Sequence, residues 1–261
     1  MEAWSCTGRG KRGMVLPAMI LALLCALPAP LRAERVPEKL VYSLSWTGIP
    51  VGTATQEIVE AGETRRITST ARSNDWLSAF FPVEDLIEST LDKSLAPFPG
   101  LTRYYRMQTR EGRHRRDREI TFEQEKGTAR YHDRRSGDRR DIPITAPTYD
   151  VYGSFYYVRY LPLEVGKPAT VTILDGTEPR SIEVRVLRKE KLATVLGEVD
   201  TVVIRPMVKQ EGVFEGKGTV TIWLTDDARR IPVKAQTKVI VGSVTATLTG
   251  GDPLPAPAAG K

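Results

Sequence analysis

Apolar and polar residues alternate along most of the chain from Leu40 onward, with the period of two that is typical of half-buried β-strands. The clearest alternation lies in residues 218–248, where the apolar positions are Val220, Ile222, Leu224, Ile231, Val233, Ala235, Val239, Val241, Val244, Ala246 and Leu248. A polar segment at 226–229 and Gly242 divide this stretch into three runs. The pattern predicts three antiparallel strands.

The same alternation predicts further strands upstream. The expected strands lie near 39–47, 52–60, 64–73 and 85–92, in three runs within 101–133, and near 169–174, 180–189 and 199–208. Turn-forming residues at 49–52 and 61–63 separate the first three as a meander.

Two segments break the alternation and favour helices. Asn74 or Asp75 is expected to cap a short helical turn that ends at Pro82. Asp150 is expected to cap an amphipathic helix that ends at Pro162, because the apolar residues after it fall at helical spacing.

These elements predict an all-β, mainly antiparallel protein. We expect a curled sheet, a barrel or half-barrel of about twelve strands, with one covering α-helix. No change of composition suggests a domain linker, so residues 34–250 are expected to form a single domain. The tail at 251–261 is rich in Pro, Gly and Ala and is expected to be disordered.

The N-terminus has the features of a signal peptide. Arg9, Lys11 and Arg12 precede an apolar run at 14–27, and small residues follow up to Ala33. We expect residues 1–33 to be cleaved, with Ala29 as another cleavage position, and the mature protein to lie in the periplasm with no transmembrane segment. Lipidation at Cys25 is disfavoured because bulky Leu24 precedes it.

Removal of this leader changes the chemistry that the chain can support. Cys6 and Cys25 are the only cysteines, so the mature chain would have neither disulfides nor thiolate metal sites. The whole chain has 38 basic and 32 acidic residues, of which the leader contains four and one. The mature chain therefore has 34 basic and 31 acidic residues. A net charge of +3 gives no reason to expect a nucleic-acid partner.

Positive charge concentrates between Arg103 and Arg140, a segment that contains twelve Arg and one Lys but only seven acidic residues. Arg113, Arg115 and Arg116 are the candidate residues for binding an anion or a protein partner, since guanidinium groups match phosphate and carboxylate geometry. The alternative is a solvated edge whose charges prevent aggregation between sheets.

No residue pattern predicts a catalytic or metal site, and no cofactor is expected. His114 and His132 each have Arg within two residues on both sides, which disfavours a bound cation. Asp226 and Asp227 fit the role of turn residues that bond to backbone amides better than that of a catalytic acid pair. Asp85 and Glu88 are an equally weak candidate for a catalytic acid pair. Ser154 lacks a nucleophile elbow, and the "GKG" at 216–218 precedes a strand and not a helix.

Aromatic residues are the remaining candidates for a binding site. We expect them to line an apolar cavity between sheet and helix, and the alternative is an ordinary core. They are Trp46, Trp76, Phe80, Phe81, Phe155 and Tyr156.

Three segments, in this order and spacing, resemble the DUF3108 family of exported bacterial proteins. They are "LVYSLSWTGIPVGTA", "DVYGSFYYVRYLPLEVGK" and "GTVTIWLTDDARRIPVKAQTKVIVGSVTATL", and the resemblance covers almost all of the mature chain. It implies a periplasmic β protein and supplies no active-site residues. A curved sheet crossed by a helix is also the plan of periplasmic lipoprotein carriers, an analogy of fold.

Three functions remain open on this basis. The first is a non-enzymatic protein of the cell envelope that binds a lipid or another amphiphile in a half-barrel. The second is a scaffold protein that is recruited to an envelope assembly through the Arg-rich region. The third is a hydrolase with carboxylates on the concave face, which would need two converging acids and one raised pKa.

Overall fold

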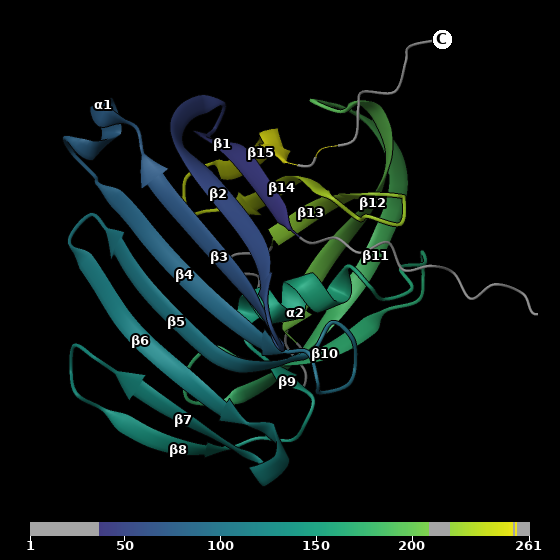
Figure 1. Ribbon diagram of the computed structural model, residues 1–261. Helices are drawn as coiled ribbons and strands as arrows, with labels where there is room; N and C mark the ends of the chain where they lie inside the picture. Colours follow the sequence, from purple (N-terminus) through teal and green to yellow (C-terminus); the bar gives the residue numbers. More distant parts are fainter. Residues whose placement is uncertain (1–36, 209–219, 253, 255–261) are drawn as a thin grey trace, which may run out of the picture. The chain divides into compact units, whose positions relative to one another are not determined.

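The computed structural model describes residues 37–208, 220–252 and 254, all of them within one compact unit, Ala33–Lys261. The expected signal peptide and the "GKG" at 216–218 lie outside the described residues, as does most of the expected C-terminal tail. The described chain is all-β, with fifteen strands in one mostly antiparallel sheet and two short α-helices (Figure 1). Neither helix among these residues is long and apolar enough to cross a membrane.

The sheet consists of two meanders that meet at its centre. The N-terminal meander is β1 Glu38–Trp46, β2 Ile49–Ala61, β3 Thr64–Ser73, β4 Val83–Asp92, β5 Leu101–Glu111, β6 His114–Glu123, β7 Thr128–Asp133 and β8 Arg139–Pro143. The C-terminal meander is β9 Thr148–Tyr149, β10 Ala169–Leu174, β11 Pro179–Thr194, β12 Gly197–Val208, β13 Val220–Thr225, β14 Pro232–Lys238 and β15 Ser243–Asp252. Helix α1 spans Asp75–Ser78, α2 spans Val151–Val158, and a 3-10 turn spans Gln124–Lys126.

The pairing of β1 with β15 joins the two meanders. The chain runs from this centre to the edge strand β8, crosses to the other edge strand β9, and returns through α2 and β10 to the centre. Only β9 and β10 pair in parallel. The two edges, β8 and β9, do not pair with each other among the described residues, so the sheet is neither closed nor strongly curled.

Several expectations about the sheet need correction. There are fifteen strands and not about twelve, because the charged edge strand β8 and the two-residue β9 have no recognisable alternation. A closed barrel is wrong because the sheet is open. The strand expected to reach Val241 ends at Lys238, since residues 239–242 form a turn in which the Val239 N–H donates to the Gly242 carbonyl over 3.2 Å.

Asp150 begins helix α2, as the sequence predicted. Its Oδ1 accepts hydrogen bonds from the backbone N–H groups of Tyr152 and Gly153 at 2.8 and 3.0 Å. Its Oδ2 accepts from the hydroxyl groups of Ser89 and Thr102 at 2.6 and 2.8 Å. The cap therefore also fixes the start of α2 to strands β4 and β5.

Helix α2 packs against strands from both meanders. Tyr156 belongs to a buried cluster with Ile58 and Ile67 of β2 and β3. Val158 belongs to another with Ile204 and Leu224 of β12 and β13. These contacts place α2 on one face of the sheet, between its two halves (Figure 1).

A buried ion pair fixes the end of α2. Arg159 donates to both carboxylate oxygens of Glu38 at 2.7 and 2.8 Å, and each side chain is at most 1% exposed. Arg159 also donates to the carbonyl oxygens of Arg229 and Arg230, both at 3.0 Å. The helix end is thereby bound to the start of β1 and to the β13–β14 turn.

We predict that Arg159→Met lowers the free energy of unfolding by about 3–5 kcal/mol, because it leaves the Glu38 carboxylate buried without a partner. The measurement is urea denaturation followed by circular dichroism. The double variant E38M/R159M should recover most of that loss, since it removes both charges. Equal losses in the single and double variants would contradict this explanation.

Candidate functional site

The face of the sheet that carries α2, called the inner face below, has an apolar floor. Successive strand partners form one cross-strand row of small and branched side chains. The row runs through Gly52, Leu44, Ala246, Ala235, Ile222 and Ile204, on β2, β1, β15, β14, β13 and β12. Ile204 and Ile222 belong to the cluster that contacts α2, which places the row on the inner face.

An apolar cavity of about 1150 Å³, called the mouth cavity below, lies at one end of this row. Its lining is mainly aliphatic and aromatic, and its charged residues are Arg72, Glu111 and Lys238. The apolar lining comes from β1, β2, α1 and the segment after it, the start of β4, the β14–β15 turn and the start of β15: Leu44, Trp46, Val51, Leu77, Phe81, Val83, Val239, Ile240, Val241 and Val244.

Two smaller cavities lie deeper, beside α2. One of about 380 Å³ lies between α2 and strands β10–β13, and one of about 220 Å³ lies between α2 and strands β1–β3 and β13–β15. Tyr152, Phe155 and Ile222 line both. The two cavities therefore meet around the exposed side of α2.

Strand geometry connects the mouth cavity with the deeper ones. Leu44 and Val244 line the mouth cavity, while Tyr42 and Ala246 line the 220 Å³ cavity. Residues two apart on a strand point to the same face, so Leu44 follows Tyr42 and Val244 follows Ala246 along the inner face. We call these three neighbouring cavities together the inner groove.

The opposite part of the inner face is polar. Asp85, Thr109 and Arg116 are successive partners on β4, β5 and β6. Asp85 lies two residues from Ile87, which packs in the cluster under Tyr152, so these three side chains share the inner face. Burial raises the pKa of Asp85, and the negative charge of Glu111 raises it further. The hydrogen bond from the backbone N–H of Arg110 and the positive charge of Arg116 lower this pKa but do not cancel the rise.

The structure brings four of the six expected aromatic residues together. Trp46 and Phe81 line the mouth cavity at 41% and 46% exposure, and Trp76 and Phe80 lie beside them on α1 and directly after it. The indole N–H groups of Trp46 and Trp76 donate to the carbonyl oxygens of Val241 and Pro50 at 2.8 and 3.2 Å. With Phe80 at 85% exposure, these four residues are not an ordinary core.

The other two aromatic residues lie elsewhere. Phe155 lines both deeper cavities, at the inner end of the groove. Tyr156 is fully buried, where its hydroxyl accepts a hydrogen bond from the Tyr160 hydroxyl at 2.9 Å and its ring contacts Arg65 and Arg159. Tyr156 is a core residue and not part of the groove.

Sequence reasoning missed part of the mouth cavity. Val239, Ile240 and Val241 were interpreted as a strand, yet they form an exposed apolar turn, with Ile240 fully exposed. Three consecutive apolar residues cannot all point to one face of a strand, and this break in the alternation before Gly242 was the available signal.

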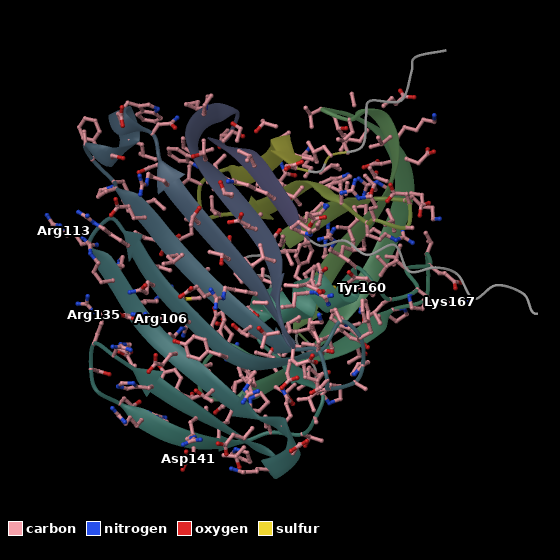
Figure 2. All side chains as sticks on the ribbon, in the orientation of Figure 1. Arg106, Arg113, Arg135, Asp141, Tyr160 and Lys167 are labelled. Atoms are coloured by element: carbon pink, nitrogen blue, oxygen red, sulfur yellow. The ribbon has the colours of Figure 1, made fainter. Side chains whose placement is uncertain are left out.

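Strand alternation separates the three candidate arginines. Arg115 and Arg116 are neighbours on β6 and point to opposite faces, and Arg113 lies in the β5–β6 turn (Figure 2). Figure 2 also shows Arg135 in the β7–β8 turn. Arg115, Arg116 and Arg135 nevertheless line one cavity, whereas Arg113 is not among its lining residues.

The histidines and paired acids do not form a site. His132 Nδ1 lies 3.0 Å from Glu119 Oε1, and His114 is exposed at the β5–β6 turn. Asp227 accepts hydrogen bonds from the backbone N–H groups of Arg229 and Arg230, as expected for turn chemistry. In the described part of the chain, no group of three or more His, Cys, Asp or Glu residues could hold a metal ion.

Ser154 and the Asp85–Glu88 pair show no catalytic arrangement in the described residues. The Ser154 hydroxyl donates to the Val151 carbonyl of its own helix at 2.7 Å. Asp85 and Glu88 are three residues apart on β4, so they point to opposite faces.

Comparison with known proteins identifies a family and a fold. The sequence profile described as "Protein of unknown function (DUF3108)" matches residues 41–249. No curated protein matches the chain. The β-barrel-like DUF1849 protein of Brucella abortus is similar in structure, with a TM-score of 0.55 and 11% identity over 83% of this chain and 97% of that protein. A Bacteroides fragilis protein with a YmcC-like fold, described as a candidate for export, has a TM-score of 0.31 and 9% identity over 83% and 95% of the two chains.

The surroundings of Asp85 on the polar part of the inner face predict its titration. Its carboxyl carbon, followed by NMR, should titrate above the ordinary Asp pKa of about 3.9, and the Arg116→Gln variant should raise that pKa further by removing a favourable charge. Because the folded-state pKa is raised, the contribution of Asp85 to stability is present below the unfolded pKa and is lost as pH rises through the folded one. A midpoint at or below the ordinary value would contradict the burial of Asp85.

Proposed function

We propose, on the premise that the chain belongs to the DUF3108 family, that it is a non-enzymatic periplasmic protein of the cell envelope that binds a lipid or another amphiphile in the inner groove. In this proposal the inner face of the open sheet and α2 form the two sides of the binding site. Membership of the family assigns no function by itself, and the cavities of the inner groove are what support binding.

One observation carries the proposal: a large apolar cavity opens where exposed aromatic and aliphatic side chains gather. Of the eleven large hydrophobic residues that are exposed in the described chain, eight lie at or beside the mouth cavity. Scattered exposed hydrophobic residues are normal on a soluble protein, but a contiguous set beside a cavity indicates a binding site. The eight are Trp46, Ile49, Trp76, Phe80, Phe81, Val239, Ile240 and Val241.

The two walls of the groove favour a ligand with an apolar chain and a polar end. An alkyl chain on the apolar floor would gain about 0.8 kcal/mol for each buried CH₂ group. A polar end would find charged side chains along the mouth cavity, which form its polar wall: those of Arg72, Glu111 and Lys238. A purely apolar ligand would leave that wall unused.

The periplasmic location rests on the N-terminal sequence. The charged, apolar and small-residue segments at 1–33 are those of an exported precursor. An exported protein with an apolar groove can shield an amphiphile from water between the envelope membranes.

The test uses the exported protein, recovered from the periplasm without detergent. Native mass spectrometry with lipid extraction should find a bound amphiphile, or a 1:1 complex after incubation with envelope lipids. Leu44→Trp should weaken binding at least about tenfold, because the larger side chain occupies space above the floor of the groove. A tenfold loss of affinity corresponds to about 1.4 kcal/mol of binding free energy.

A second variant is Phe81→Asp, and its matched control is Val195→Asp. Phe81 and Val195 are similarly exposed, at 46% and 44%, but only Phe81 lines the mouth cavity. Phe81→Asp should therefore reduce binding and Val195→Asp should not. A protein that stays free of lipid under both conditions, or equal losses in the two variants, would contradict the proposal.

A further inference from the structure

The outer face of the sheet, which points away from α2, carries a second and different cavity. It measures about 720 Å³ and is called the outer groove below. Most of its lining belongs to two cross-strand rows on β2–β6, whose side chains alternate with inner-face residues such as Asp85 and Arg116. The first row is Thr53, Arg72, Glu84, Arg110 and Arg115, and the second is Thr55, Thr70, Leu86, Gln108 and Asp117. The lining is completed by Arg135 and by the residues between the two rows, Ala71, Asp85, Thr109 and Arg116.

The acids of the two rows are already paired. Glu84 accepts from Arg110 at 3.3 Å. Asp117 accepts from Arg106 and from Gln108, each at 3.3 Å. Three guanidinium groups in the groove, those of Arg72, Arg115 and Arg135, have no acidic partner among the described residues, so the groove keeps an excess of positive charge.

One of these three is held in position. Arg115 donates through Nη1 to the carbonyl oxygens of Gly112 and His114, at 2.7 and 2.9 Å. These bonds restrict the side chain and leave its other N–H groups for a ligand. An ordered guanidinium loses less entropy on binding an anion than a freely rotating one.

The uncharged lining narrows the chemistry of the ligand. The hydroxyl groups of Thr53, Thr55 and Thr70 both donate and accept hydrogen bonds, and the carboxylates of Glu84 and Asp117 only accept. A ligand that carried only anionic oxygens would be repelled by those two carboxylates. A ligand with hydroxyl groups as well as anionic groups can use all of them.

We infer that the outer groove binds an acidic oligosaccharide, with its acidic groups on Arg72, Arg115 and Arg135 and its hydroxyl groups on the threonines and carboxylates. Strands β3 and β6 are three spacings apart, about 14 Å, so the ligand is an extended chain of several sugar rings and not a single ion. This site is on the opposite face from the inner groove and does not depend on amphiphile binding.

The experiment measures binding of an oligogalacturonate of about ten units to the exported protein by titration calorimetry at low salt, with a neutral maltodextrin of similar length and a polyphosphate as comparisons. The oligogalacturonate should bind more tightly than either. The triple variant R72Q/R115Q/R135Q should weaken this binding about tenfold, as expected for three exposed charge contacts. Because Arg72 also lines the mouth cavity, amphiphile binding is measured on the double variant R115Q/R135Q, whose affinity for amphiphiles should not change.

A second triple variant, R66Q/R139Q/R180Q, has the same change of net charge at exposed positions outside the outer groove and should keep nearly full affinity. Equal losses in the two triple variants would show attraction by net charge alone and overturn the inference. So would tighter binding of polyphosphate or maltodextrin, or the absence of oligogalacturonate binding. Because R115Q/R135Q changes only residues outside the mouth cavity, its amphiphile binding reports on the inner groove alone, and failure of either site is visible separately.

Discussion

The buried pair of Glu38 and Arg159 is the interaction on which the arrangement of the sheet around α2 depends. Its bidentate bonds connect the end of α2 to β1, the strand through which the two meanders meet. Two buried charges are stable here only because they satisfy each other and because the carbonyl oxygens of Arg229 and Arg230 accept the remaining N–H groups. With Asp150 fixing the other end to β4 and β5, α2 is held at both ends on the inner face.

This position of α2 explains why the inner groove can stay open. The helix buries Tyr156 and Val158 in two hydrophobic clusters between the two halves of the sheet. Away from the helix, the floor row consists of small residues such as Gly52, Ala235 and Ala246, which leave volume. A Cβ atom at Gly52 would lie only 2.3 Å from the Arg72 carbonyl oxygen, so the close approach of β2 and β3 there requires glycine.

Much of this fold could be predicted from the sequence, because the period-two pattern is strong and the Asp150 cap is unambiguous. What could not be predicted were features decided by pairing. The edge strand β8 is mostly polar, and the end of β14 is set by the turn at 239–242 and not by hydrophobicity. The family resemblance was confirmed by the match over residues 41–249.

The candidate sites were harder to predict than the fold. The aromatic residues could be identified, but only the structure separates Trp46 and Phe81 at the mouth cavity from Tyr156 in the core. The Arg-rich segment could be seen, yet only the structure shows that Arg115, Arg116 and Arg135 line one cavity and Arg113 does not. Composition contains no information on which face a charge occupies.

Quenching of tryptophan fluorescence by an amphiphile brominated in its alkyl chain tests the central claim most directly. Of the tryptophans in the described residues, Trp46 lines the mouth cavity, Trp76 lies beside it, and Trp223 is buried in a separate cluster. The account predicts saturable quenching that is largely lost in Trp46→Phe while Trp223 stays bright. No saturable quenching, or the same quenching in Trp46→Phe as in the unsubstituted protein, would contradict an amphiphile in the inner groove.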